Sequence, residues 1–295
     1  MRHDLTTEAQ NLSSRAIDAL PTGQMLEIIN TADREVAEAV RREIPAIAAA
    51  VDEVTGRLER GGRLFYMGAG TSGRLGVLDA SECPPTFNAP PEMVQGLIAG
   101  GDGALRRSVE KAEDDPEGGK RDLEERGFAA GDALVGIAAS GRTPYVLGGL
   151  RYARGLGALT VGLSCTANSE VAQASEIAIT PVPGPEIITG STRMRAGTAT
   201  KMVLNMLSTG VMIRMGFVYG NLMVNVQPTN EKLTDRARRI ISAITGVSYD
   251  EASRLLAKAG SVRTAVVMHE RQLSREEAET MLAAAKGRLR VALGQ

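Results

Sequence analysis

The sequence predicts an α/β protein in which helices flank a parallel sheet, followed by a small all-helical C-terminal domain. Short apolar runs bounded by turn residues alternate with helical patterns, which is typical of a parallel sheet. The 33 glycines among 295 residues suit tight strand-to-helix turns, and the end of the chain shows helical periodicity. Hydrophobic residues make up 43% of the chain and aromatic residues only 3%, so we expect an aliphatic core.

The predicted strands are apolar runs of strand length, which suit strands buried on both faces. We expect them at residues 63–68, 94–99, 133–138, 158–163 and 176–180. Helices are expected between and after the strands, at residues 72–81, 103–113, 144–156, 168–174 and 190–216.

The two ends of the chain show a different organisation. Residues 1–22 are polar and form an arm, and residues 24–60 follow a helical pattern in which Asn30–Asp33 are expected to cap a second helix. Near the C-terminus we expect helices at 233–245, 249–259 and 275–293, while 261–268 could be a helix instead of a strand. This predicts an N-terminal arm with helices over 1–60, an α/β domain over 61–225, and a helical subdomain over 226–295.

Composition excludes several classes of function. The formal net charge of −1 argues against a nucleic-acid partner or an anionic membrane partner. Two cysteines give no disulfide framework, and two histidines make a histidine-based metal site improbable. No stretch approaches ~20 apolar residues, and the first five residues lack the apolar core of a signal peptide. We therefore expect a soluble cytoplasmic protein.

A glycine-rich turn follows the first predicted strand. The run Leu64–Arg74 ends in Gly-Ala-Gly-Thr-Ser-Gly before a helical pattern begins. Glycines let the backbone approach an anion, and the N–H groups of the helix N-terminus point at it, while Thr71 and Ser72 add hydroxyl donors. The spacing fits neither a Walker loop nor a dinucleotide fingerprint. A plain turn without a ligand is the alternative.

A second loop of this kind follows the strand at 133–138. Its sequence is Ala-Ser-Gly-Arg-Thr-Pro, with Pro144 at a plausible first helical position. Ligands of parallel sheets bind at the carboxyl ends of the strands, so both loops could surround one phosphate, unless they are two unrelated turns. The start of the helix at 190–216 is also hydroxyl-rich and basic, which suits an anion.

Two groups of carboxylates could supply acid–base chemistry. Glu82 lies just before Pro84-Pro85, which we expect to end the helix at 72–81. The second group, at the end of the helix predicted at 103–113, contains Glu110, Glu113, Asp114 and Asp115. A solvated surface is the alternative for these acids, but two carboxylates near a phosphate loop suggest a general acid and a general base. Cys83 has no histidine nearby and is expected to be a small buried side chain.

Four segments resemble the signature of the N-acetylmuramic acid 6-phosphate etherase family. They are Tyr66–Thr86, Gly96–Gly101, Ala139–Tyr145 and Gly190–Thr198, and the likeness runs from about residue 6 to residue 290. One departure is Phe87-Asn88, where we expect an aromatic residue followed by glycine. The resemblance implies a sugar isomerase (SIS) domain, a three-layer sandwich, followed by a small helical domain.

The resemblance also implies cleavage of the D-lactyl ether at carbon 3 of N-acetylmuramic acid 6-phosphate, giving N-acetylglucosamine 6-phosphate and D-lactate. In the family, the Glu of Ala-Ser-Glu-Cys-Pro-Pro is the acid or base at the ether oxygen, which is Glu82 here. The Glu before the Asp in Val-Glu-x-Ala-Glu-Asp removes the carbon 2 proton, which is Glu113 here. No cofactor or metal is implied, and members act as homodimers.

Phosphate binding is assigned to Ser72, Ser140 and Thr143, supported by Thr71 and Gly141. Glu186 could open the sugar ring or cap a helix, and Ser191 and Arg193 are further expected substrate-binding residues. Two other functions remain open: an aldose–ketose isomerase, and a non-enzymatic sugar-phosphate sensor like the glucokinase regulatory protein.

Overall fold

A computed structural model describes residues 6–107 and 109–295 of the chain. The chain divides into two compact units. The sheet unit comprises the described residues up to Ser81 together with Pro91–Ser208, and the helical unit comprises Glu82–Pro90 and Thr209–Gln295. The three-part division expected from the sequence stays a prediction.

The sheet unit is built on a parallel sheet of five strands in the order β2-β1-β3-β4-β5. The strands are β1 (Leu64–Gly68), β2 (Val94–Ile98), β3 (Ala133–Ile137), β4 (Leu159–Leu163) and β5 (Ile177–Ile179). The predicted parallel sheet is therefore confirmed. From β1 the chain crosses to β2 on one side, and later to β3 on the other, so the topological switch point lies between β1 and β3.

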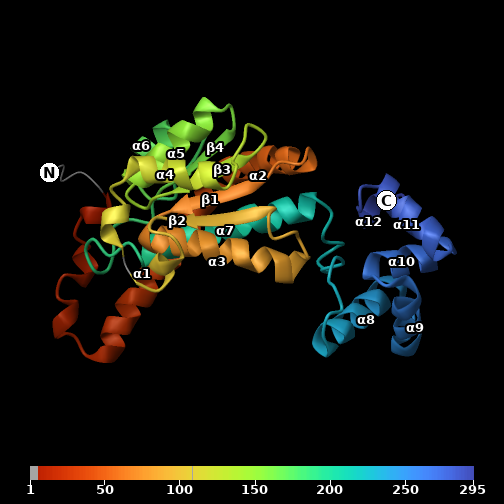
Figure 1. Ribbon diagram of the computed structural model, residues 1–295. Coiled ribbons are helices and arrows are strands. Elements are labelled where there is room, and N and C mark those ends of the chain that lie inside the picture. The colour runs from red at the N-terminus through yellow and green to blue at the C-terminus, as the bar shows by residue number, and fades with distance from the viewer. Residues whose placement is uncertain (1–5, 108) are drawn as a thin grey trace. The chain divides into compact units, whose positions relative to one another are not determined.

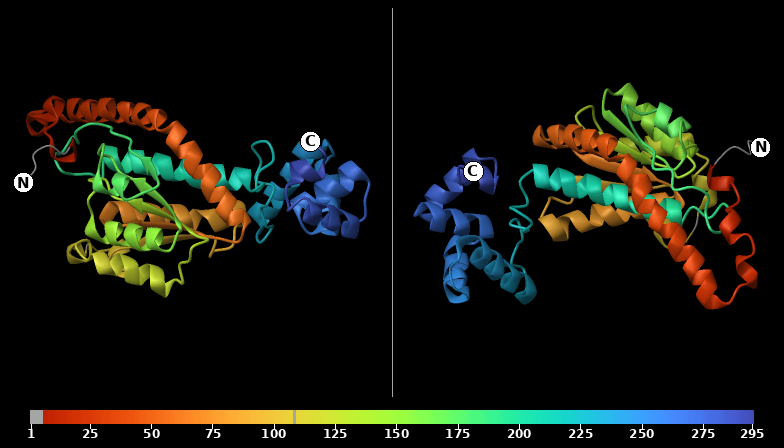
Figure 2. Two further views of the ribbon diagram at one scale, coloured as in Figure 1. Left: turned by 90° about the horizontal axis from the view of Figure 1, so that it is seen from above. Right: turned by 180° about the vertical axis from the view of Figure 1, so that it is seen from behind.

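Helices cover both faces of this sheet (Figures 1 and 2). On one face lie α4 (Pro116–Glu125), α5 (Pro144–Gly155) and α6 (Glu170–Gln173), and on the other lie α3 (Gly70–Phe87) and α7 (Arg195–Arg214). Phe65 and Met67 pack in the core beneath α5, whereas Tyr66 faces α3, where a Cβ on Gly76 would lie 2.9 Å from the Tyr66 Cβ. Alternate side chains of β1 thus enter opposite layers.

The N-terminal segment differs in one respect from the prediction. Three short 3-10 helices, Thr6–Glu8, Leu12–Ser14 and Ile17–Ala19, precede α1 (Thr22–Arg42) and α2 (Ile44–Glu59). The expected second cap at Asn30–Asp33 is wrong, because α1 continues through it. The break comes at Glu43, since Pro45 has no N–H with which to continue the α1 hydrogen-bond pattern.

The segment after β2 also corrects the prediction. Residues 103–113 do not form an α-helix but two 3-10 helices, η4 (Asp102–Leu105) and η5 (Glu110–Ala112). An unexpected helix, α4, then begins at Pro116, capped by Asp115, whose Oδ1 accepts a hydrogen bond from the Gly118 N–H at 3.0 Å. The acids at 110–115 therefore precede a helix, where negative charge is favourable, instead of ending one.

The proline pair does not end α3 as expected. The helix continues through Pro84 and Pro85 to Phe87, and the Asn88 N–H donates to the Pro84 carbonyl at 2.8 Å. Prolines in a last helical turn keep a helical φ and lose only their own donors. Asn88 has φ of 51°, a left-handed conformation that asparagine tolerates and glycine prefers, which explains how it stands at the expected glycine position.

The helical unit confirms two of the three predicted C-terminal helices, those at 233–245 and 249–259. It contains α8 (Glu231–Thr245), α9 (Tyr249–Ala259), α10 (Val262–Arg271), α11 (Arg275–Ala284) and α12 (Leu289–Ala292) around its own apolar core. The segment at 261–268 belongs to a helix. The single helix expected at 275–293 is split, because Lys286 and Gly287 adopt positive φ values of 52° and 74°.

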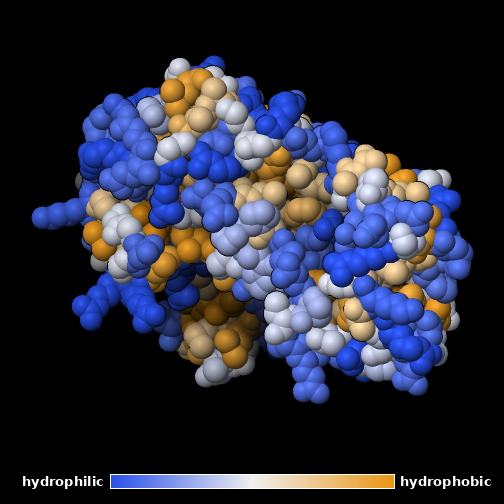
Figure 3. Space-filling view, turned by 45° about the vertical axis from the view of Figure 1, so that its right-hand side comes forward, coloured by the Kyte–Doolittle hydropathy of each residue, from blue (hydrophilic) through white to orange (hydrophobic). Residues whose placement is uncertain are grey.

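No helix in the described ranges combines the length and apolar character that crossing a membrane requires. Hydrophilic residues cover most of the face shown in Figure 3, with hydrophobic residues in patches between them.

Candidate functional site

A cavity of about 530 Å³ opens at the carboxyl ends of β1 and β3, at the switch point of the sheet. Ligands of open parallel sheets bind at such positions. Its lining comes from the loop after β1, the loop after β3, the turn at Glu113 and Asp114, the loop before α7, and Glu8 of the arm. Both predicted loops therefore meet at one cavity.

The first wall is the turn from β1 into α3. Thr71 and Ser72 line the cavity within the first turn of α3, where backbone N–H groups have no acceptor inside the helix. Gly70 has φ of 52°, which glycine adopts without strain. A Cβ on Gly73 would lie 2.6 Å from the Gly68 carbonyl oxygen, so only glycine lets α3 begin this close to the strand.

The second wall is the turn from β3 into α5. Ser140 and Thr143 line the cavity, and Pro144 occupies the first helical turn, as predicted. Gly141 adopts φ of 72°, and a Cβ there would lie 2.2 Å from the Ser169 Cβ, so this turn requires glycine. The cavity thus lies at two helix N-termini with hydroxyl side chains on both, an arrangement that favours an anion.

Glu113 is held at the edge of this cavity by contacts with the second wall. The Thr143 hydroxyl donates to Glu113 Oε1 at 3.0 Å, and the Tyr145 N–H donates to the Glu113 carbonyl at 3.1 Å. The side chain remains exposed. A carboxylate with one fixed oxygen and access to the cavity can accept a proton from a bound molecule.

Three lining residues with charged or hydroxyl side chains were not expected at the site, Glu8, Arg142 and Thr192, and a fourth, Asp114, was expected only as a member of the acidic group at 110–115. Arg142 lies between Gly141 and Thr143, within a loop that the sequence had already indicated, and it adds positive charge to the cavity. Glu8 comes from the N-terminal arm and has no local sequence signal. A Cβ on Gly190 would lie 3.6 Å from Glu8 Oε2, which places that carboxylate beside the loop before α7.

Glu82 does not belong to this lining, as far as the described residues go. It is an exposed residue of α3, ten residues after Ser72. At 1.5 Å per residue, a helix separates two such positions by about 15 Å along its axis. Gly190 and Thr192 line the cavity. The predicted residues Ser191 and Arg193, which alternate with them along the chain, do not.

Glu186 lies at the start of α7, where it caps the helix. Its two carboxylate oxygens accept hydrogen bonds from the N–H groups of Arg195 and Ala196, both at 2.9 Å. The side chain is only 1% exposed, and this burial raises its pKa against the lowering effect of the two hydrogen bonds. Both oxygens are therefore occupied by the helix, which favours the capping role over ring opening.

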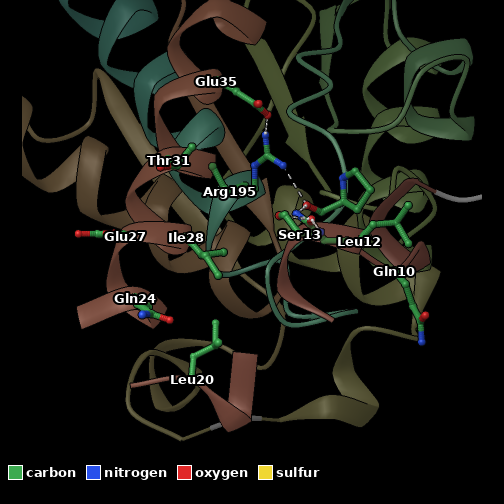
Figure 4. A pocket seen from close by; sticks show the side chains of 13 residues that line it. Gln10, Leu12, Ser13, Leu20, Gln24, Glu27, Ile28, Thr31, Glu35 and Arg195 are labelled. Carbon is green, nitrogen blue, oxygen red and sulfur yellow. Dashed lines mark hydrogen bonds and ion pairs between the residues drawn. The ribbon is translucent and has the colours of Figure 1, made fainter. Parts of the chain in front are cut away.

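A larger cavity, of about 900 Å³, lies between the N-terminal arm and α1 (Figure 4). Arg195 points toward Glu35 there, with its Nη2 at 2.6 Å from Glu35 Oε2. The lining mixes apolar residues such as Leu12, Leu20 and Ile28 with polar ones. Its lining contains no residue of the two glycine turns, so we take the smaller cavity as the candidate active site.

Comparison with known proteins identifies the family. The family described as "Glucokinase regulatory protein N-terminal SIS domain" matches residues 46–154. An N-acetylmuramic acid 6-phosphate etherase from Rhodopirellula baltica is 56% identical over 97% of this chain and 95% of the relative. Etherases from Clostridium beijerinckii (52%, covering 98% and 96%) and Cronobacter sakazakii (54%, covering 98% of each) are similar along the same length. The chain belongs to the N-acetylmuramic acid 6-phosphate etherase family.

A solved structure supports the SIS-type fold of this etherase-family chain. A Bacteroides fragilis protein assigned as a phosphosugar isomerase involved in capsule formation superposes with a TM-score of 0.50. It covers 67% of this chain and 94% of its own, at 20% identity, so the likeness concerns the fold alone.

Three buried or titratable features of this etherase-family chain lie outside the cavity lining. Asp79 of α3 accepts a hydrogen bond from the Ser208 hydroxyl at 3.1 Å, and burial raises its pKa to about 6. Cys83 is buried, as predicted, and burial raises the pKa of the Cys165 thiol to about 12.

The described residues contain no group of three or more acidic, histidine or cysteine side chains suited to a metal ion.

Proposed function

We propose that this chain is a lyase that cleaves the D-lactyl ether of N-acetylmuramic acid 6-phosphate, giving N-acetylglucosamine 6-phosphate and D-lactate, in the cytoplasmic breakdown of cell-wall amino sugars. The observation that carries the proposal is the identity of more than half of all residues with etherases along nearly the whole chain. The cavity at the strand ends is consistent with a phosphorylated sugar.

The phosphate of the substrate binds between the two glycine turns. Ser72 and Ser140 supply hydroxyl donors, with Thr71 and the Gly141 backbone beside them. Thr143 lies in the same turn, and its one hydroxyl hydrogen goes to Glu113 Oε1. Two helix N-termini favour the negative charge, and Arg142 adds a full positive charge at the rim. Ser191 and Arg193 contribute to substrate binding from the loop before α7, which also contains the lining residues Gly190 and Thr192.

The chemistry proceeds by elimination and then addition, because an ether oxygen is a poor leaving group for direct displacement by water. Opening of the sugar ring exposes an aldehyde that acidifies the hydrogen on carbon 2. Glu113 takes that proton, the carbon 2–carbon 3 double bond forms, and the carbon 3–oxygen bond breaks as an acid protonates the departing lactate oxygen. Water then adds to carbon 3 and a proton returns to carbon 2. Each acid–base role contributes roughly 10²–10⁴-fold in rate.

We assign to Glu82 the role of the acid that protonates the ether oxygen. Its position on α3 determines which copy of the chain can supply it. About 15 Å of helix separates Glu82 from Ser72, which is more than the span from phosphate to ether oxygen in one small sugar. We therefore propose that the enzyme is a homodimer in which Glu82 of a second copy reaches the cavity that contains Glu113. Each active site would then need two chains.

The N-terminal arm and α1 are the proposed dimer contact. Leu12 is 79% exposed and Leu26 is 55% exposed, and the neighbouring cavity of about 900 Å³ is lined in part by apolar side chains. Burying such residues against a second copy would stabilise the association by about 25 cal/mol for each Å² of apolar surface removed from water.

The activity is tested by incubating the purified chain with N-acetylmuramic acid 6-phosphate and assaying D-lactate. We expect stoichiometric lactate and sugar phosphate, and no reaction with unphosphorylated N-acetylmuramic acid at the same concentration. Interconversion of an aldose and a ketose phosphate without lactate release would reject the etherase in favour of an isomerase. Binding of sugar phosphates without turnover would favour a sensor.

A further inference from the structure

The helical unit contains a polar cavity that the proposed function does not use. Its volume is about 350 Å³. The lining consists of Asn88, of residues 224–229, and of Gly260, Ser261 and Arg263 at the start of α10. The polar groups are the side-chain amides of Asn88, Asn225 and Gln227, the hydroxyls of Thr229 and Ser261, and the guanidinium of Arg263. None of its lining residues is acidic.

Arg263 is the only charged side chain among the described residues of this lining, and it is partly buried. Its Nη1 donates to the Gly287 carbonyl at 3.1 Å, and a Cβ on Gly287 would lie 2.8 Å from the same nitrogen, so the guanidinium is packed in place. Among the residues that the structure describes, no carboxylate pairs with Arg263. Burial without an acidic partner lowers the pKa of Arg263. Desolvating an unpaired cation is unfavourable, and a bound anion would offset that cost.

In the two cavities that Arg263 lines, the one carboxylate among the described residues is already paired with another arginine. A second, smaller cavity of about 270 Å³ shares Ser261 and Arg263 and includes Glu279, but Glu279 Oε1 already accepts a hydrogen bond from Arg275 Nε at 2.7 Å. Asn225 is held by its Nδ2, which donates to the Phe87 carbonyl at 2.6 Å. The cavity therefore combines the Arg263 guanidinium and the fixed Asn225 amide with the side chains of Asn88, Gln227 and Thr229, while the Ser261 hydroxyl donates to Thr264 Oγ1 at 2.8 Å.

We propose that this cavity is a second binding site for a small oxyanion, held by the Arg263 guanidinium and the amide and hydroxyl groups beside it. The shared chemistry is a carboxylate or phosphate group small enough for 350 Å³. Arginine recognises both through parallel N–H donors. The site lies wholly within the helical unit and does not depend on the proposed catalytic role of the strand-end cavity.

Equilibrium dialysis of the full chain against radiolabelled inorganic phosphate tests the proposal. We expect two phosphates per chain for the wild type, one for Arg263→Gln, and two for the control Arg254→Gln, an exposed arginine of the same unit paired with Glu251. Arg263→Lys should weaken the second site without abolishing it. A wild type that binds a single phosphate, with a stoichiometry that Arg263→Gln leaves unchanged, would overturn the proposal.

Two further variants protect the test against misfolding and against confusion with the active site. Thr229→Asp, at an exposed position of the lining, puts a negative charge into the cavity and should also remove one phosphate while leaving Arg263 in place. The double variant Ser72→Ala, Ser140→Ala should lose the other phosphate and keep the Arg263 site. Binding in Thr229→Asp equal to that of the wild type would contradict the proposal even if Arg263→Gln failed to fold.

The source of the oxyanion follows from competition in the Ser72→Ala, Ser140→Ala variant. Displacement of the remaining phosphate by D-lactate would identify a carboxylate ligand, and displacement only by N-acetylglucosamine 6-phosphate would identify a phosphate monoester. Phosphate binding in this variant that Arg263→Gln fails to reduce would show that Arg263 is not the anchor.

Discussion

The hydroxyl of Thr143 donates a hydrogen bond to Glu113 Oε1 at 3.0 Å. This bond joins the turn that begins α5 to the turn that precedes α4, although the two residues are 30 positions apart in the sequence. It fixes one carboxylate oxygen and leaves the other available to a bound molecule. The contact therefore couples the proposed phosphate-binding wall to the proposed base.

Removing this hydrogen bond should slow the reaction without abolishing it. Thr143→Val keeps the side-chain shape and loses the donor, and a hydrogen bond to a charged group is worth about 1.5–3 kcal/mol. We expect kcat/KM to fall by roughly 10–100-fold in assays of D-lactate release. Thr143→Ser retains the donor and should stay within a few-fold of the wild type. Wild-type activity in Thr143→Val together with a loss in Thr143→Ser would mean that the methyl group, not the hydrogen bond, matters.

Mixed dimers test whether the two glutamates of one site come from different chains. Glu82→Gln and Glu113→Gln should each lower kcat by roughly 10²–10⁴-fold. When the two inactive variants are mixed and allowed to exchange subunits, random pairing should restore roughly a quarter of the wild-type activity, because half of the dimers are mixed and each mixed dimer contains one intact site. Separately tagged chains allow the mixed dimer to be purified and assayed. If both glutamates of a site belonged to one chain, mixing would restore nothing.

Asp79 should make stability depend on pH in the acidic range. Burial raises its pKa from 3.8 to about 6, so the folded state binds this proton more tightly than the unfolded state does. The stabilisation is complete below pH 3.8 and is lost as pH rises to about 6. Between these two pH values, the contribution of Asp79 to the free energy of unfolding falls by about 3 kcal/mol.

Urea unfolding of the wild type and Asp79→Asn between pH 4 and pH 7 measures this effect. The free energy of unfolding of the wild type relative to Asp79→Asn should decrease over that range and level off above about pH 6. A difference that does not change with pH would show that Asp79 titrates alike in both states.

Glu186 should contribute to stability through its cap on α7. Glu186→Ala leaves the N–H groups of Arg195 and Ala196 without acceptors in a buried position, at about 1–3 kcal/mol for each. Glu186→Gln keeps one oxygen acceptor, so its free energy of unfolding should fall by less than that of Glu186→Ala. The exposed control Glu53→Ala should change the free energy of unfolding by less than about 0.5 kcal/mol. Denaturant titration gives these values.

The same variants test the other role predicted for Glu186. If this carboxylate opens the sugar ring, folded Glu186→Gln should lose kcat by at least tenfold. A kcat close to that of the wild type would leave capping as its function.

The sequence predicted the sheet and both glycine turns because their causes are local. Apolar runs of strand length and glycines at strand ends are visible in any window of a few residues, and Gly141 and Gly70 do adopt the positive φ values that such turns need. The missed helix α4 has a different cause. Its segment Pro-Glu-Gly-Gly reads as a loop, yet a Cβ on Gly119 would lie 2.0 Å from the Tyr145 carbonyl oxygen. Glycine is needed there for close packing against α5, which only the fold reveals.

The candidate site was predictable only in part for the same reason. Ser72, Ser140 and Thr143 carry local signals, and the sheet order brings them together. Glu8 reaches the cavity from the arm, and Glu82 lies outside the lining although it follows Ser72 on the same helix. Such long-range relationships have no signature in neighbouring residues.

Removal of the carbon 2 proton by Glu113 is tested most directly by running the reaction in D₂O and reading carbon 2 by NMR. The wild type should give N-acetylglucosamine 6-phosphate with deuterium at carbon 2. Glu82→Gln, which keeps the base, should exchange this hydrogen in unreacted substrate, whereas Glu113→Gln should not. A wild-type product that retains hydrogen at carbon 2, or exchange by Glu113→Gln at the wild-type rate, would contradict the proposed mechanism.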